Sequence, residues 1–234
     1  MGVRMDIPGT LEVPGIRLVA ERFSMTNLFP HEGFDEWAVA YDTSVSNEQF
    51  PFNGYQRVLR QVVALAEARP GMSVLDLGTG TGNLAAGFAR LGCELWCTDF
   101  SAPMLVQARQ KLPHAQFLQH DLRTDLPAEW KRSFDRIVSA YVFHHFDLDE
   151  KVHILRGLLP WLAPSGRMVI GDIAFRNQAA LDKVKTEAGQ EWEDEFYWLV
   201  DRSRVALTKA GLLVSYQQIS FCAGVFVLFP SEQF

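Results

Sequence analysis

Residues Val74-Leu-Asp-Leu-Gly-Thr-Gly-Thr-Gly-Asn-Leu84 give the clearest indication of the fold. The first half of this stretch, from Ser73 to Leu77, is a short apolar run that predicts a buried strand. The glycines at 78, 80 and 82 then predict a tight turn in which a ligand can approach bare backbone. In doubly wound folds, ligands bind at this carboxyl edge of the sheet. We therefore expect the main binding site directly after the first strand.

Helix-like and strand-like segments alternate on both sides of this stretch. Apolar residues recur at helical spacing from Tyr55 to Ala66, and strand-like runs cover residues 93–98, 116–119, 136–140 and 167–173. Ser101 and a capping box at 147–150 predict two further helix starts, and residues 82–90 have helical composition. The last two strand-like runs, 212–219 and 225–229, are joined by a turn too short for a helix and should pair antiparallel. The pattern predicts a doubly wound, Rossmann-like α/β fold with a mostly parallel sheet.

The chain divides into an N-terminal arm and one domain. Residues 1–30 form the arm, because Pro8, Pro14 and Pro30 prevent a long helix there. Residues 31–234 form the domain, with a long insertion at 174–200 that contains an acidic stretch, 187–195. Two interpretations of the insertion remain open: a helix with a solvated surface, or a lid over the binding site.

Three aspartates surround the glycine turn. Asp76 precedes the first glycine by two residues, Asp99 ends the second strand, and Asp121 follows the third. The glycine spacing is Gly-x-Gly-x-Gly and differs from the Gly-x-Gly-x-x-Gly of dinucleotide binders. A carboxylate at 76 would repel a pyrophosphate but attract an ammonium group. The acid at 99 could accept hydrogen bonds from both ribose hydroxyls, and the acid at 121 could accept one from an adenine amine. S-adenosylmethionine (SAM) combines an ammonium, a ribose and an adenine without phosphate.

With these residues the sequence resembles the class I SAM-dependent methyltransferases, whose signature loop matches residues 76–82. The resemblance runs from about Phe34 to Phe229. The motifs Phe34-Asp-Glu-Trp-Ala, Gly54-Tyr55 and Tyr141-x-Phe-His-His145 are most similar to those of the small bacterial YrrT-type methyltransferases. The resemblance implies a seven-stranded sheet with an antiparallel C-terminal strand. It also implies cofactor contacts at Gly78, Asp99 and Asp121.

The predicted cofactor site combines strand ends, the glycine turn and an entrance helix. Tyr41 and Tyr55 are included because the family has its entrance helix there, whereas core packing is the alternative for most aromatic residues, Trp37 among them. The predicted cofactor-binding residues are Asp76, Gly78, Thr79, Gly80, Gly82, Asp99, Phe100, Met104, Asp121, Leu122, Ala140, Tyr41 and Tyr55.

His144 and His145 follow the fourth strand, beside the expected position of the transferred methyl group. Either could act as a general base, with an unperturbed pKa near ~6.5. The alternative is that one packs or caps while the other faces solvent. Neighbouring side chains should point to different sides, and no second ligand set has convincing spacing, so we expect no metal. Methyl transfer itself depends mainly on holding the acceptor in line with the methyl–sulfur bond.

Composition narrows the class of partner. The 234 residues include 22 Lys+Arg and 28 Asp+Glu, and the resulting charge of −6 argues against a generic nucleic-acid binder. Three cysteines are too few for a disulfide framework, and no apolar run approaches the ~20 residues of a membrane helix, so we expect a cytoplasmic protein. The sequence thus predicts a SAM-dependent methyltransferase for a small-molecule acceptor, monomeric or homodimeric, without nucleic-acid or membrane partners. Methylation of a protein or an RNA, and a non-catalytic SAM-binding module, remain alternatives; a dehydrogenase fits the Asp76 and glycine spacing poorly.

Overall fold

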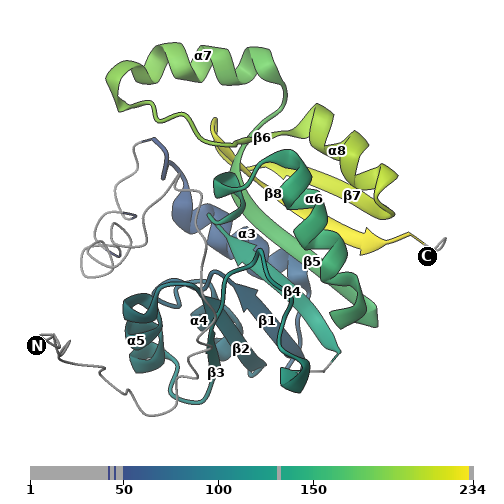
Figure 1. Cartoon of the computed structure of the whole chain (residues 1–234). Coiled ribbons are helices and arrows are strands. Elements are labelled where there is room, and N and C mark those ends of the chain that lie inside the picture. Colours follow the sequence, from purple (N-terminus) through teal and green to yellow (C-terminus); the bar gives the residue numbers. More distant parts are fainter. Residues whose placement is uncertain (1–41, 43–44, 46–49, 131–132, 232–234) are drawn as a thin grey trace, which may run out of the picture.

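The computed structural model describes residues 42, 45, 50–130 and 133–231. The arm at 1–30, Trp37 and Tyr41 therefore lie outside the described residues. The strands are β1 (Ser73–Leu77), β2 (Glu94–Asp99), β3 (Gln116–Gln119), β4 (Phe134–Ala140), β5 (Leu162–Phe175), β6 (Trp198–Leu199), β7 (Leu212–Gln218) and β8 (Ala223–Pro230). They form one sheet in the order β3-β2-β1-β4-β5-β8-β7, with β6 paired to β5 (Figure 1).

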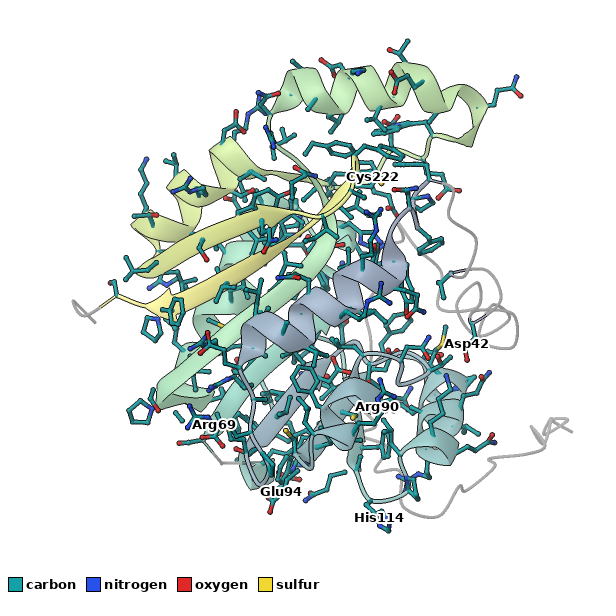
Figure 2. All side chains as sticks on the ribbon, turned by 180° about the vertical axis from the view of Figure 1, so that it is seen from behind. Asp42, Arg69, Arg90, Glu94, His114 and Cys222 are labelled. Carbon is teal, nitrogen blue, oxygen red and sulfur yellow. The ribbon has the colours of Figure 1, made fainter. Side chains whose placement is uncertain are left out.

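Helices cover both faces of this sheet. They are α3 (Tyr55–Ala66), α4 (Ala85–Arg90), α5 (Ala102–Lys111), α6 (Leu148–Gly157), α7 (Gln178–Ala188) and α8 (Val200–Lys209), with the 3-10 turns η1 (Ala128–Trp130), η2 (Phe143–His145), η3 (Leu159–Trp161) and η4 (Gly189–Glu191). α6 and α8 lie in front of the sheet in Figure 1, whereas α3 lies behind it and faces the viewer in Figure 2. Two buried apolar clusters, one on each face, form the core. Of the helices that the structure describes, none is both long and apolar enough to cross a membrane.

The strand directions confirm the predicted fold. β1 pairs parallel with β2 and β4, β2 with β3, and β4 with β5. β8 is the reversed strand, because it runs antiparallel to both β5 and β7. The short turn before β8 leaves no room for a crossover helix, which is the physical reason for the reversal. The doubly wound α/β prediction is therefore correct, and the seven strands that the resemblance implies are joined by an eighth, the short β6 from the insertion.

Local signals located most element boundaries. The predicted bounds of β1 and β3 match the structure, Ser101 caps α5 by accepting from the Met104 N–H, and Asp147 and Glu150 form the predicted capping box at α6. The predicted helix start at 82 is wrong, since α4 begins at Ala85. The preceding residues instead form a turn whose glycines have positive φ, a conformation that a right-handed helix cannot include.

The insertion after β5 is attached to the carboxyl end of the sheet. It contains α7 and η4 and returns as β6, whose residues Trp198 and Leu199 pair with Ala174 and Phe175 of β5. α7 lies beyond β6 at the top of Figure 1, and Val184 is its one buried residue. Residues 192–198 therefore run along the sheet edge at which β1 and β4 also end.

Candidate functional site

The glycine turn after β1 combines two packed glycines with one open position. A Cβ on Gly78 would lie 2.4 Å from a Val142 methyl group, and one on Gly82 would lie 3.0 Å from Leu112. A Cβ on Gly80 would meet nothing within 4 Å among the described residues, although its φ of 53° is in the left-handed region. Gly80 therefore leaves open space against bare backbone, as a close-fitting ligand requires.

Asp99 holds this turn in place from the end of β2. Its Oδ2 accepts a hydrogen bond of 2.7 Å from the Gly80 N–H, and its Oδ1 accepts one of 2.9 Å from the Ser101 N–H. Asp99 is buried. Asp99, the predicted partner of the ribose hydroxyls, is thus hydrogen-bonded directly to the open Gly80, although the two residues are 19 positions apart in sequence.

Asp76 is a buried carboxylate beneath the turn, only 1% exposed. Its Oδ2 accepts a hydrogen bond of 2.7 Å from the hydroxyl of Thr79, another predicted cofactor residue. Its Oδ1 has no hydrogen bond of normal geometry to a described residue, although the nearby Ala85 N–H favours the ionised form. Burial raises the pKa of Asp76 to about 7, and Asp99 adds to this. A cationic ligand would favour its ionised form.

The other predicted cofactor residues are distributed along the same sheet edge. Phe100 follows β2, Met104 is buried in the first turn of α5, Leu122 packs at the margin of a core cluster, and Ala140 ends β4. Asp121 follows β3, and its Oδ1 accepts a 2.9 Å hydrogen bond from the Arg123 N–H within its own loop.

Tyr55 begins α3 and contacts both the glycine turn and the end of β4. Its hydroxyl accepts a hydrogen bond of 3.4 Å from Asn83, and its ring centroid lies 5.1 Å from that of Tyr141. Tyr141 has a φ of 57°, and its buried hydroxyl has no hydrogen-bond partner in the described part of the chain. A strained backbone at the end of a central strand is typical of functional sites.

Asp42 is bonded to the glycine turn and to α5 by contacts that the sequence did not predict. Its Oδ1 accepts hydrogen bonds from Thr81 (2.7 Å) and Asn83 (2.9 Å), and its Oδ2 pairs with Lys111 Nζ at 2.6 Å. Burial alone would raise the pKa of Asp42, but Lys111 and the two other donors lower it below the ordinary value. The partners lie 39 to 69 residues away, so no local pattern marks this contact.

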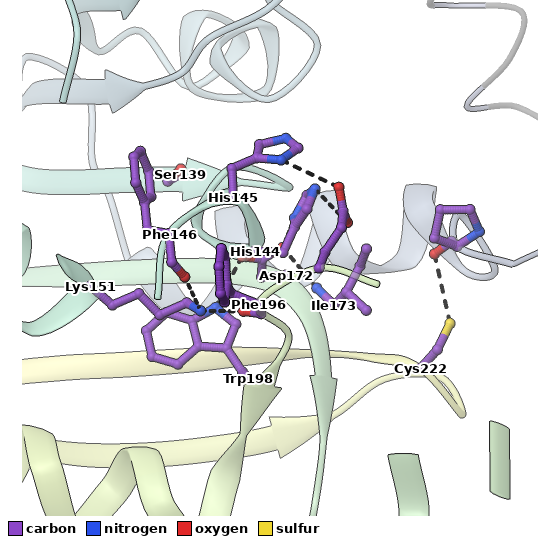
Figure 3. A network of polar contacts seen from close by, with 12 residues as sticks. Ser139, His144, His145, Phe146, Lys151, Asp172, Ile173, Phe196, Trp198 and Cys222 are labelled. Atoms are coloured by element: carbon purple, nitrogen blue, oxygen red, sulfur yellow. Dashed lines mark hydrogen bonds and ion pairs between the residues drawn. The ribbon is translucent and has the colours of Figure 1, made fainter. Parts of the chain in front are cut away.

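His144 belongs to a buried hydrogen-bonded network (Figure 3). Its Nδ1 lies 2.6 Å from Asp172 Oδ1 in β5, and Asp172 also accepts from the Ile173 N–H (2.8 Å) and from Trp198 Nε1 (3.0 Å). Burial alone would lower the pKa of His144, but the Asp172 carboxylate raises it above the ordinary value. Burial would likewise raise the pKa of Asp172, but His144 and the other donors hold it low. An ionised Asp172 is an acceptor, so Nδ1 of His144 carries the proton.

Both histidines face Glu195 of the insertion. His144 Nε2 lies 3.7 Å from Glu195 Oε2, and His145 Nδ1 lies 3.4 Å from Glu195 Oε1. The two rings are adjacent, with centroids 4.1 Å apart. The prediction that these neighbours point to different sides is therefore wrong, because residues 192–198 fold back over η2 and meet both rings. Burial and the neighbouring His144 lower the pKa of His145.

Lys151 of α6 fastens the two segments that carry these groups. Its side chain is 2% exposed, and Nζ donates to the carbonyl oxygens of Phe146 (2.6 Å) and Phe196. The ammonium also lies 5.0 Å from the ring centroid of Trp198. Burial lowers the pKa of Lys151 to about 8. Phe146 and Phe196, whose carbonyl oxygens accept from Lys151, directly follow His145 and Glu195. Lys151 therefore holds the backbone next to both of these residues in place.

Aromatic rings join the insertion to the rest of the edge. Trp192 stacks on Phe50 with centroids 5.2 Å apart and rings inclined by 14°, and Tyr197 packs edge-on against Trp192 (5.1 Å) and Phe175 (5.8 Å). The two interpretations of the insertion thus apply to different parts of it. α7 is largely solvated, whereas residues 192–198 cover the sheet edge, and their action as a lid stays a prediction.

Comparison with known proteins places this geometry in context. The model of a methyltransferase domain family matches residues 74–166. An uncharacterized methyltransferase from Anoxybacillus flavithermus is 33% identical over 78% of this chain and 89% of its own length, and one from Geobacillus kaustophilus is 34% identical over 79% and 89%. The structure of magnesium protoporphyrin IX methyltransferase from Synechocystis PCC 6803, solved with bound SAH, superposes with a TM-score of 0.70 at 19% identity, over 86% of this chain and 98% of that one. The solved structure supports the fold, and the relatives indicate the family.

Proposed function

The chain belongs to the class I SAM-dependent methyltransferases, and from this premise we propose that it methylates a small-molecule acceptor between the glycine turn and residues 192–198. The observation that carries the proposal is the closure of this segment over the sheet edge. There it brings Glu195 to 3.4 Å from His145 and stacks Trp192 on Phe50. An edge covered in this way suits a compact acceptor better than an extended polymer.

The glycine turn fits the cofactor. Gly80 leaves open the space that another residue's Cβ would fill, and Asp76 offers a buried carboxylate oxygen without a well-formed hydrogen bond. We propose that Asp76 attracts the ammonium of SAM and that Asp99 accepts hydrogen bonds from its ribose hydroxyls. Asp121, Phe100, Met104, Leu122, Ala140 and Tyr55 complete the proposed adenosine side, together with the turn residues Gly78, Thr79 and Gly82.

The protein's own contribution to the reaction is placement and proton handling. Bound SAM supplies a methyl group on a positively charged sulfur, which is reactive without further activation. Orientation and proximity alone can account for ~7–11 kcal/mol of the barrier. The aromatic rings of Trp192, Tyr197 and Phe175 pack against one another at this edge and give it an apolar surface. We propose that His144 and His145 act on the acceptor, where they handle any proton that the acceptor must lose.

The groups that meet at the acceptor side support a small-molecule substrate. They are aromatic rings, two histidines and the carboxylate of Glu195, a set that favours an apolar or weakly cationic acceptor. A protein or RNA substrate would instead favour a basic strip beside the methyl group. The three cysteines are free, which is consistent with action in the cytoplasm.

Thermal unfolding tests the cofactor assignment directly. A saturating ligand that binds only the folded state stabilises it by about 2.7 kcal/mol at 100 times its Kd. SAM and its demethylated product should therefore raise the Tm of the full-length protein, whereas NAD and ATP should not. A rise with NAD or ATP but none with SAM would contradict the proposal.

The acceptor class is tested with SAM carrying a labelled methyl group. The protein is incubated with a cell extract separated into a small-molecule filtrate, a protein fraction and an RNA fraction. We expect label to accumulate in organic compounds of the filtrate. Label confined to protease-sensitive or nuclease-sensitive material would support the polymer alternative. SAM binding without transfer to any fraction would support the non-catalytic alternative.

A further inference from the structure

Three side chains with metal-ligating atoms converge at the acceptor edge. They are His144 and His145 of η2 and Glu195 of the insertion, and one ligand atom from each lies within 4.8 Å of the others. The residues come from two segments separated by about fifty positions, so their convergence is a product of the tertiary fold. All three are at least half-buried. They form a compact donor set of two imidazoles and one carboxylate.

The separations within this set resemble those of ligands around a shared ion. The nitrogen–oxygen distances from Glu195 are 3.7 Å to His144 and 3.4 Å to His145. Ordinary N–H···O hydrogen bonds are about 2.7–3.2 Å long. Two ligand atoms that are each about 2.05 Å from a tetrahedral Zn²⁺ are about 3.3 Å apart. The observed spacings exceed hydrogen-bond lengths and approach the ligand–ligand distance, so small side-chain adjustments would admit the ion.

His144 has the outer support that a metal-binding histidine requires. Asp172 accepts the Nδ1–H of His144 at 2.6 Å, which leaves the lone pair of Nε2 facing Glu195. Asp172 is in turn held by the Trp198 indole and the Ile173 N–H (Figure 3). A carboxylate behind a histidine, which fixes its tautomer and ring orientation, is the usual second layer of a metal site.

The backbone around the ligands is held in place without an ion. Lys151 donates to the carbonyl groups of Phe146 and Phe196, the residues that follow His145 and Glu195 (Figure 3). The Phe196 N–H also donates to the His144 carbonyl oxygen at 3.0 Å. Phe196, next to Glu195, is therefore tied directly to His144 and through Lys151 to Phe146, the two residues that flank His145. An ion entering it would find the ligands already close to their bound positions.

We propose that His144 Nε2, His145 Nδ1 and the Glu195 carboxylate bind one divalent transition-metal ion, with zinc the best match to the donor set. Three protein ligands leave a coordination position for another molecule, as in catalytic zinc sites. This inference rests on the proposed function and deepens it, because a bound Zn²⁺ lowers the pKa of an oxygen or sulfur ligand. The acceptor class is then a small molecule with an ionisable hydroxyl or thiol. Its lone pair forms the new bond to carbon, the carbon–sulfur bond electrons stay on the cofactor sulfur, and the acceptor proton passes to solvent. With the ion bound, the two histidines assist loss of this proton as ligands of the ion and no longer as bases.

The test measures metal binding on the full-length protein after treatment with a chelator. Zn²⁺ is titrated in competition with a chromophoric chelator, and Co²⁺ is added separately because tetrahedral Co²⁺ absorbs visible light. We expect one equivalent of each ion to bind. Loss of an outer-layer partner of a metal ligand weakens binding about 10–100-fold, and loss of a direct ligand should weaken it at least as much. His145→Ala and Glu195→Gln should therefore each reduce the affinity for zinc by at least that factor. Both variants should also lose the cobalt absorption band.

His153→Ala is the matched control, since His153 is an exposed histidine of α6 outside the cluster. It should bind both ions as the parent does. Absence of stoichiometric binding by the parent, or equal binding by the His145→Ala and His153→Ala variants, would overturn the metal proposal. The SAM-dependent rise in Tm is recorded on the same samples and also reports folding. A SAM shift without zinc binding would refute the metal site and leave the proposed function standing, whereas zinc binding without a SAM shift would refute the proposed function.

Discussion

Two regions of the same sheet edge are built in opposite ways. The cofactor region at β1 and β2 is formed by a continuous turn, whose open Gly80 is held by a short hydrogen bond to Asp99. The acceptor region at β4 and β5 is formed by side chains from η2, β5 and the insertion, joined through Asp172 and Glu195. The first region combines exposed backbone with carboxylates held at a single turn, whereas the second consists of ionisable side chains from separate segments.

The two constructions differ in how far their residues can be substituted. A backbone cradle has to keep its glycines, because any Cβ at position 78 would collide with Val142. A side-chain cluster depends on a few substitutable residues, and one of them, Glu195, lies on an insertion that one short strand pair connects to β5. The two regions touch at Val142, which directly precedes η2. We therefore expect mutations to affect cofactor binding and acceptor chemistry separately.

The largest effect should come from Asp172→Ala. This change leaves His144 buried without its partner, and breaking a buried ion pair in this way costs about 3–5 kcal/mol of unfolding free energy. Urea denaturation at neutral pH measures the loss. Burial alone would raise the pKa of Asp172, but His144 and the other donors lower it, so its stabilising contribution is present above the ordinary pKa of an aspartate. That contribution should disappear as the pH falls through the lowered value.

Asp182→Ala in the exposed part of α7 is the control for this loss and should change stability little. Asp172→Ala protein that circular dichroism shows to be folded should still bind SAM, because the glycine turn is intact. A variant as stable as the parent would contradict the stabilising role of the His144–Asp172 pair, and a folded variant that no longer binds SAM would contradict the separation of the two regions.

The second effect is on the cofactor region. Asp99→Ala removes the proposed ribose ligand and the acceptor of the Gly80 N–H, so we expect the Kd for SAM to rise at least about 100-fold, equivalent to about 2.8 kcal/mol. Isothermal titration calorimetry measures this change. Zinc binding should survive in the same variant. Asp125→Ala, an exposed acid near β3, should leave SAM binding as it is, and an unchanged SAM affinity in Asp99→Ala would disprove the site assignment.

The smallest effect is the pH dependence of SAM binding. Burial raises the pKa of Asp76 to about 7 in the free protein, so the carboxylate is largely neutral at pH 6 and largely ionised at pH 7.5. If the ionised form alone binds the SAM ammonium, affinity should increase about eightfold over this interval, or about 1.2 kcal/mol. The raised pKa of Asp76 has the opposite effect on folding stability, which falls as the pH rises. The stabilising contribution of Asp76 is complete below the ordinary pKa of an aspartate and is lost as the pH rises through 7.

Asp76→Asn supplies the comparison for this measurement, because an amide has no charge to gain. Its SAM affinity should be flat between pH 6 and 7.5, and weaker than that of the parent at the upper end. Parallel pH profiles for the two proteins would show that Asp76 does not meet the ammonium group.

The sequence predicted the cofactor region well because its signals are local. Short strand-like runs located β1 and β3, and the glycine spacing located the turn. The acceptor region was predicted only in part. His144 and His145 were singled out, but their partners Asp172, Glu195 and Lys151 were missed. Asp172 stands out as an acid inside an apolar strand, which indicates a buried partner without identifying it. Glu195 lies inside an acidic stretch, where nothing in the local pattern distinguishes it from a surface residue.

Local sequence patterns were therefore sufficient for the strands β1 to β5, the antiparallel pair β7 and β8, and the turn that we assign to SAM. These depend on backbone preferences and on periodicities within a few residues, which act whatever the rest of the chain does. The assembly of the acceptor edge depends on contacts between residues that are far apart in the sequence. Asp172 lies 28 residues from His144, and the Phe196 carbonyl lies 45 residues from Lys151. Burial in a shared apolar environment brings them together, because isolated polar groups there would be costly and each one requires a partner.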